Sequence, residues 1–336
     1  MAENLDDLFP WEEVPQRKAF LRRFWDLSQP VERHAEVFWR SEANLSSCGP
    51  AEEQLAESLR CIRDHRDVGG DFIPFLNTYL GTPMLASAFG CEVVRLGTEQ
   101  PWALPLIADY DPEAVLALKP PSPEAGLCGK NLEITSYLNE RTEGRIPVRV
   151  GDLQGPLGVA GQVWKDEHFF AAMLLDPEAA HHLLNLTTNL IVEYVKAHRT
   201  RCQEQFTIHC PHLWMPPEMG IGLSEDYLPV LSPHLYAEFG VPYVNRLAQE
   251  FGGVYIHCCG NFEHNFENLL QIENLRGIQV CLPEVSWEKL EETFGGRTVL
   301  VPLGSHNCGQ VFGGNDGLCA WVLAHTRPGT RLFLWR

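Results

Sequence analysis

Short apolar runs alternate with amphipathic stretches along most of this chain, and that alternation limits the possible folds more than any other feature. The runs have the length of buried strands, whereas the stretches between them have helical spacing. Strands that alternate with helices favour a parallel sheet covered by helices. The predicted strands are residues 71–77, 145–152, 205–210, 252–261, 276–284, 297–305 and 330–335. Seven or eight strands in 336 residues fit an α/β fold of the (β/α)8 TIM barrel type, which needs about 250 residues plus insertions.

Two of the amphipathic stretches begin with recognisable helix starts. Residues 176–199 open with Asp-Pro and residues 232–250 with Ser-Pro, and each pair is typical of an N-cap followed by the first helical position. Residues 1–66 also have helical spacing, and a Gly-Gly pair then interrupts the pattern. We therefore predict two parts, which are an N-terminal helical extension over residues 1–68 and a TIM barrel over residues 69–336.

Charge and hydropathy exclude several classes of function. The net charge of −18 would repel DNA and RNA, so no nucleic-acid partner is expected. The sequence contains no run of eighteen apolar residues and its acidic N-terminus lacks the apolar core of a signal peptide, so we predict a cytoplasmic protein without a membrane partner. In that compartment the eleven cysteines are reduced, and they are then core residues, metal ligands or nucleophiles.

Cysteine and histidine gather at the ends of four predicted strands. The carboxyl ends of barrel strands carry the active site in enzymes with this fold, so these ends define the candidate site. Those four ends carry His209, His257, Cys259, Cys281, Glu284, His306 and Cys308, and two further strand ends add Asn77, Tyr79, Asp152 and Gln154.

The His-x-Cys pair in this set suggests a zinc site. Residues i and i+2 of a strand face the same side, so His257 and Cys259 can reach one ion while Cys258 turns into the packing. With Cys308 from a neighbouring strand end they would supply the three protein ligands of a catalytic zinc. Cys281 and His306 are alternate ligands. The opposing interpretation is that Cys281 and Cys308 are small buried hydrophobes and that the other histidines only form hydrogen bonds.

A longer block around this pair resembles a known family. Residues 220–261 contain an acidic Asp226, a Ser-Pro helix start, a proline within that helix and a strand that ends in His-x-Cys-Gly. This block resembles the uroporphyrinogen decarboxylase superfamily, and residues 82–93, 151–161 and 174–185 are similar to other segments of it. The resemblance extends over roughly residues 70–335 and implies a (β/α)8 barrel.

The superfamily contains two main chemistries. Its decarboxylases bind a tetrapyrrole with many carboxylates through an arginine-rich N-terminal motif, which this sequence lacks. Its other branch moves methyl groups between a corrinoid protein and a thiol such as coenzyme M, with zinc bound by His-x-Cys and a later cysteine. His257 and Cys259 match that pair directly. Cys308 lies one strand earlier than the family's third ligand, and Cys281 competes with it.

The resemblance therefore implies a zinc-dependent methyltransferase with a small thiol or methylated substrate. It further implies a corrinoid (cobalamin) carried by a partner protein, and a homodimer. Four acidic or amide side chains are predicted to orient the substrate or the zinc ligands, namely Asp152, Gln154, Glu225 and Asp226. Four further side chains are predicted to contact the cofactor, namely Asn77, Tyr79, His209 and Glu284.

Three other functions remain open at this point. One is a metal-free lyase of the same superfamily that acts on a small carboxylated substrate. Another is a barrel that binds a corrinoid, a thiol compound or a partner protein without turnover. A zinc hydrolase is a further option, although the sequence shows no clear general base such as a His-Glu helix motif.

Overall fold

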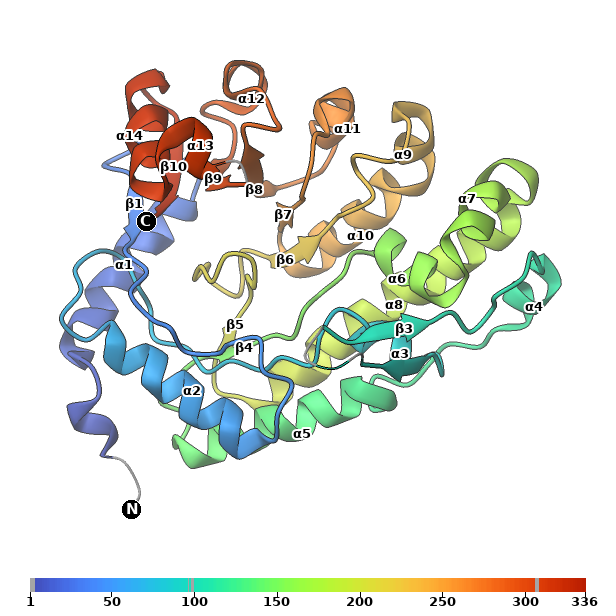
Figure 1. The fold of residues 1–336 in the computed structure, drawn as a ribbon, viewed down its shortest axis with the longest axis horizontal. Coiled ribbons are helices and arrows are strands. Elements are labelled where there is room, and N and C mark those ends of the chain that lie inside the picture. The colour runs from blue at the N-terminus through green and yellow to red at the C-terminus, as the bar shows by residue number, and fades with distance from the viewer. Residues whose placement is uncertain (1–3, 96, 98–99, 306–307) are drawn as a thin grey trace.

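Six strands lie side by side as one parallel sheet. The computed structural model describes residues 4–95, 97, 100–305 and 308–336, and the sheet runs through its centre with helices outside (Figure 1). The strands follow the order β1(Ala35–Val37), β10(Arg331–Trp335), β9(Val299–Gly304), β8(Leu275–Leu282), β7(Val254–His257) and β6(Ile221–Ser224). Four of them, β7 to β10, are predicted apolar runs, whereas β1 and β6 were not predicted. Every neighbouring pair in this sheet is parallel. All six are heavily buried, as expected for strands covered by helices.

Backbone hydrogen bonds extend this sheet through two further strands. The parallel pair β4(Val148–Arg149) and β5(Gln205–Phe206) continues the order. Gly222 N of β6 donates a hydrogen bond of 2.9 Å to Thr207 O, just beyond β5, and this bond links the two sheets. The predicted strands over residues 145–152 and 205–210 are therefore present, in shorter form.

The predicted strand over residues 71–77 completes the circuit. Leu76 forms a parallel bridge with β4, and Gly70 forms an antiparallel bridge with Val37 of β1. No continuous ladder forms here because Pro74 has no N–H to donate. With these contacts, bonds pass from strand to strand around the whole molecule, and the predicted TIM barrel with an N-terminal helical extension is confirmed.

The predicted helices are also present, with one difference. Residues 176–199 match α8(Pro177–Arg201), which begins after Asp176. The predicted helix over residues 232–250 is divided at Gly240 into α9(Pro233–Phe239) and α10(Val241–Phe251). The division follows from Pro242, which lacks the N–H that a continuous helix would need.

Further helices cover the outside of the strands (Figure 1). They are α1(Val14–Trp25), α2(Ala51–Asp64), α3(Met84–Ser87), α4(Pro112–Ala117), α5(Gly126–Arg141), α6(Pro156–Val163), α7(Asp166–Leu175), α11(Phe266–Leu269), α12(Trp287–Phe294), α13(Cys308–Phe312) and α14(Asn315–His325). Short 3-10 turns occur at η1(Leu5–Asp7), η2(Trp11–Glu13) and η3(Glu263–Asn265). In the part of the chain that the structure describes, no helix combines the length and the apolar character needed to span a membrane.

The sequence did not predict a small hairpin outside the barrel. It consists of β2(Glu92–Val94) and β3(Trp102–Leu104), which pair antiparallel. Both strands have only three residues and neither contains a buried residue, so neither has the apolar run that marks the barrel strands. The hairpin contributes to the lining of a hollow beside the carboxyl ends of the barrel strands.

The N-terminal extension packs into the barrel through aromatic side chains. Trp25 at the end of α1 is fully buried, and its ring lies 6.0 Å from that of Phe333 and 6.3 Å from that of Tyr255. Its indole N–H donates to Trp214 O at 2.9 Å. The extension also contributes β1 to the sheet. The boundary at residue 68 stays a prediction.

Arg331 of β10 ties the end of α1 to the barrel. Its side chain is buried, and one guanidinium nitrogen donates to Phe24 O at 2.6 Å and to Asp26 O at 2.9 Å. The other nitrogen donates to Gln29 O. The last carbonyls of a helix have no partner within the helix, and Phe24 O is one of these in α1, so Arg331 supplies a donor to a buried carbonyl.

We expect Arg331→Met to lower the free energy of unfolding by about 3 kcal/mol, because buried carbonyls lose a charged donor. Urea denaturation followed by circular dichroism measures this loss. Arg297→Met is the matched control, since Arg297 is exposed, and it should change stability by less than about 0.5 kcal/mol. Equal stability of the two variants would contradict this account of how the extension is held.

Candidate functional site

The register between β6 and β7 brings two separate segments of the chain together. Ser224 lies opposite His257, and Glu225, the first residue after β6, donates its N–H to His257 O at 2.8 Å. The chain that continues from β6 therefore runs beside the chain that continues from β7. As a result, Asp226 lies next to the His-x-Cys pair at the carboxyl ends of the strands.

These residues form a cluster of potential metal ligands. Ligand atoms of Asp226, His257 and Cys259 all lie within 4.8 Å of one another. Cys259 Sγ is 3.6 Å from His257 Nε2, and His257 Nδ1 is buried without a hydrogen-bond partner. Cys258 between them is fully buried, in agreement with the alternation expected for a strand. Burial lowers the pKa of His257, which favours the neutral imidazole that binds metals.

A second thiol reaches this cluster from β8. His257 lies opposite Gln279, so Cys281 lies two residues further on, beside Cys259. A hydrogen bond from Cys259 lowers the pKa of Cys281 to about 6, and the same bond raises the pKa of Cys259. The buried Gln279 also donates to Cys281 Sγ, at 3.5 Å. The pair therefore holds a thiolate readily, and thiolate is the form that binds zinc.

The predicted third ligand lies elsewhere in the structure. Cys308 is the first residue of α13, and its Sγ is 3.9 Å from Asn315 Oδ1. It does not belong to the group of ligand atoms around His257 that the described residues form. The alternate ligand His306 lies outside the described residues. Cys308 as a zinc ligand stays a prediction.

Asp152 and Gln154 form a buried network with His209. Asp152 Oδ1 accepts a hydrogen bond from Gln154 Nε2 at 2.9 Å and lies 3.2 Å from His209 Nε2. His209 is also 2.9 Å from Ser224 Oγ. Burial alone would raise the pKa of Asp152, but His209, Gln154 and Arg149 outweigh it and hold that pKa at about 2. Asp152 is therefore a permanent carboxylate close to the cluster.

Glu225 and Asp226 are neighbours in the sequence with opposite environments. Glu225 is buried, its Oε1 has no hydrogen-bond partner, and Tyr236 Oη donates to its Oε2 at 3.5 Å. Burial raises its pKa to about 8, and the charge of Asp226 adds to the effect. Asp226 is exposed. At neutral pH the buried carboxyl is thus mainly protonated, and of the two only Asp226 faces the solvent beside the candidate ligands.

The other predicted cofactor contacts have different surroundings. Asn77 is buried, and its Nδ2 donates to Leu45 O at 2.7 Å, which is a structural contact with the N-terminal extension. Tyr79 Oη donates to Gln100 Oε1 at 3.0 Å. Glu284 follows β8, and its Oε2 is buried without a hydrogen-bond partner. Their roles in cofactor binding stay predictions.

Arg149 of β4 is a further buried residue of the site that was not predicted from the sequence. It is buried, and it donates to Thr78 O at 2.9 Å while its Nε has no hydrogen-bond partner. Burial lowers its pKa to about 10, and the carboxylate of Asp152 opposes that change. A charged residue in the middle of the apolar run at residues 145–152 was the signal that could have identified it.

A hollow of about 410 Å³ adjoins the cluster at the carboxyl ends of the strands. Gln154 and Asp226 line it, and Asp226 belongs to the cluster of candidate ligands. The hairpin, α6 and the start of α7 supply its other walls. This volume suits a small-molecule substrate.

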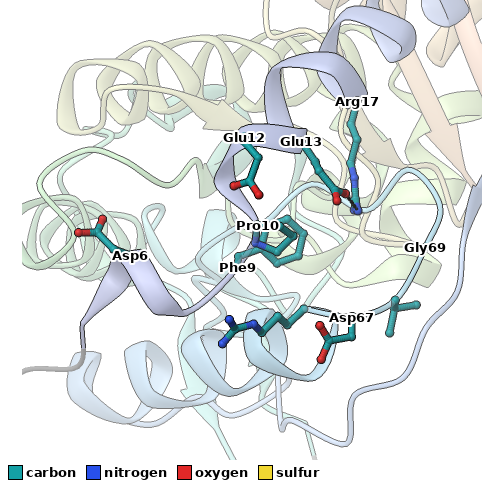
Figure 2. A pocket seen from close by; sticks show the side chains of 10 residues that line it. Asp6, Phe9, Pro10, Glu12, Glu13, Arg17, Asp67 and Gly69 are labelled. Carbon is teal, nitrogen blue, oxygen red and sulfur yellow. Dashed lines mark hydrogen bonds and ion pairs between the residues drawn. The ribbon is translucent and has the colours of Figure 1, made fainter.

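Another hollow, of about 510 Å³, lies at the start of the first predicted strand (Figure 2). Charged side chains of Glu12, Glu13, Arg17 and Asp67 surround Phe9 and Pro10 there, and Arg17 pairs with Glu13 at 2.6 Å. Active sites of barrels lie at the opposite, carboxyl ends of the strands. We therefore assign the candidate site to the hollow beside Asp226.

Comparison with known proteins relates this site to a family. Residues 75–201 match the family model described as Uroporphyrinogen decarboxylase (URO-D). The fold is similar to that of a methyltransferase from Methanosarcina mazei, with a TM-score of 0.70 and 17% sequence identity over 94% of this chain and 91% of that chain. A GH138 enzyme targeting pectin rhamnogalacturonan II aligns over 80% of this chain and 48% of that chain, with 11% identity and a TM-score of 0.29, which is too low to indicate a shared fold. No curated protein sequence matches the chain.

The two informative matches complement each other. The family match begins in the first predicted strand and ends with α8, so it includes Asp152 and Gln154 but stops before the His-x-Cys pair. The structural match covers 94% of the chain and so includes most of the second half of the barrel. Together they confirm the predicted resemblance of this chain to the uroporphyrinogen decarboxylase superfamily.

Proposed function

We propose that this protein is a zinc-dependent methyltransferase that moves a methyl group between a corrinoid and a thiol substrate. The observation that carries the proposal is the cluster of Asp226, His257 and Cys259, whose ligand atoms lie within 4.8 Å of one another. The fold shared with the methyltransferase from Methanosarcina mazei supports the reaction class.

The residues at the cluster fit a zinc ion. Imidazole nitrogen, thiolate and carboxylate are the donors that zinc prefers, and catalytic sites use three of them. His257 Nδ1 is a buried nitrogen without a partner, which is unfavourable unless something binds nearby. Cys281 offers a further thiol through its contact with Cys259. His257 and Cys259 would hold the ion, with the third ligand supplied by Cys308, as predicted from the sequence, or by Asp226 or Cys281.

A zinc ion bound there would lower the pKa of a substrate thiol, so that a thiolate nucleophile exists at neutral pH. The surrounding residues would prepare the site for that chemistry. Gln279 lies beside His257 in the sheet register and can fix the position of the neighbouring thiols. Gln154 lines the hollow and donates a hydrogen bond to Asp152, so the two side chains can orient the substrate together.

The predicted partners extend this proposal. The methyl group would come from a corrinoid on a separate protein, and the open side of the hollow at the carboxyl ends of the strands is where such a protein would approach. A cytoplasmic location and a homodimer remain proposals from the sequence and the family resemblance.

We expect the protein to bind about one zinc ion per chain, and we expect Cys259→Ser to lose it because a thiolate ligand is removed. Elemental analysis of protein purified without a metal-affinity tag measures the zinc content. Cys202→Ser is the matched control, because Cys202 is also a free cysteine but precedes β5 at the other end of the strands. Absence of zinc from both the parent and the control would sink the proposal and favour the metal-free lyase or a binding protein.

The third ligand is identified by a separate comparison. We expect Asp226→Asn to raise the dissociation constant for zinc at least about tenfold, because its carboxylate belongs to the cluster. Competition with a zinc chelator measures that constant, and Asp316→Asn, at an exposed acid in α14, serves as the control. A loss of affinity in Cys308→Ser with normal affinity in Asp226→Asn would instead support the ligand predicted from the sequence.

A further inference from the structure

We propose that the hollow beside Asp226 selects a substrate that carries an alkylated ammonium group. The inference rests on the proposed function only in treating the occupant as a substrate. Its physical basis is an exposed indole ring and several carboxylates that line the same cavity, together with Asp226 of the candidate metal cluster.

The shape of the hollow suits a small organic molecule. Its volume is about 410 Å³, and Trp102 and Ala103 of β3, with Pro105 just after it, contribute apolar surface to its lining. Gly158 and Gly161 of α6 line it without side chains of their own. An inorganic cation would gain little from such walls, whereas an alkyl group buries apolar surface against them.

Trp102 provides an aromatic surface for a cation. Its side chain is 59% exposed, and it is the only tryptophan among the exposed large apolar side chains in the described part of the chain. An indole face is the strongest aromatic partner for a cation, and quaternary ammonium groups are commonly recognised in this way. Tyr227 lines the same hollow, with its ring 5.1 Å from that of Phe170.

Carboxylates outnumber basic groups around the hollow. Asp166, Glu167 and Asp226 line it together with one basic side chain, Lys165, which already pairs with Glu167 at 2.7 Å. If Asp226 binds the metal ion and its charge is neutralised there, the lining still contains two acidic side chains, Asp166 and Glu167, and one basic side chain, Lys165. A positively charged ligand is therefore favoured at this position, and a carboxylate or sulfonate is disfavoured.

One of these acids is held in place by the wall itself. Tyr227 Oη donates a hydrogen bond to Asp166. A side chain at Gly161 would collide with both the Tyr227 hydroxyl and the Asp166 carboxylate, so the glycine makes room for this pair. The carboxylate of Asp166 therefore has a fixed position at the hollow and differs from that of a mobile surface side chain.

The experiment compares choline with 3,3-dimethyl-1-butanol, its neutral isostere, in calorimetric titrations of the zinc-loaded full chain. We expect choline to bind about tenfold more tightly, and Trp102→Leu to remove most of that preference. Trp321→Leu is the control, since Trp321 belongs to α14 and stacks on His325 with ring centroids 4.3 Å apart. Because Trp102 is exposed, its replacement should leave the fold intact. Equal binding of the two compounds would overturn the proposal.

Further titrations show which molecule carries the ammonium group. Tighter binding of thiocholine than of choline in the parent, lost in Cys259→Ser, would support a cationic thiol as the methyl acceptor. Equal binding of thiocholine and choline would instead support a methylated ammonium compound without a thiol as the substrate. Preferential binding of 2-mercaptoethanesulfonate would overturn the inference and leave the zinc methyltransferase standing. Choline binding by a protein that takes up no zinc would support the cation site and contradict the proposed function.

Discussion

The in-phase pairing of β6, β7 and β8 is the constraint on which the candidate site depends. Ser224 lies opposite His257, and His257 lies opposite Gln279. β6 and β7 end in this row and β8 continues to Leu282. Two residues further along each segment, the side chains of Asp226, Cys259 and Cys281 come together. A shift by one residue in either pairing would turn one of them to the opposite face of the barrel.

Burial then decides the charge that each group carries. Glu225 and Asp226 have the same chemistry, yet burial makes Glu225 a weak acid while Asp226 stays in contact with water. Inside the barrel, Arg149 and His209 hold Asp152 in its ionised form in spite of burial. The site therefore combines a protonated carboxyl, a permanent carboxylate and a thiol pair in which the pKa of Cys281 is lowered and that of Cys259 is raised, all within a few residues of the strand ends. Such a combination of shifted groups is typical of functional sites.

Much of the fold could be predicted from local patterns. Helix α8 begins where its Asp-Pro pair predicted, and the strands of the second half of the barrel lie where the apolar runs do. Strand β6 was not predicted by itself, because four residues between a loop and a helix give too short a pattern. The break at Gly240 was not predicted either, because it depends on a single proline within a good helical pattern. The hairpin before α4 was not predicted because its two strands have no buried face.

The sequence by itself determined the barrel class, the His-x-Cys pair and its place at a strand end, because these depend on spacing within single segments. Only the tertiary structure decided which distant residues join that pair. It placed Asp226 and Cys281 beside Cys259, and it placed Cys308 against Asn315. It also brought Trp102 of the hairpin to the hollow beside Asp226. Strand register and loop paths set these distances, and both follow from packing over the whole chain, which no local pattern contains.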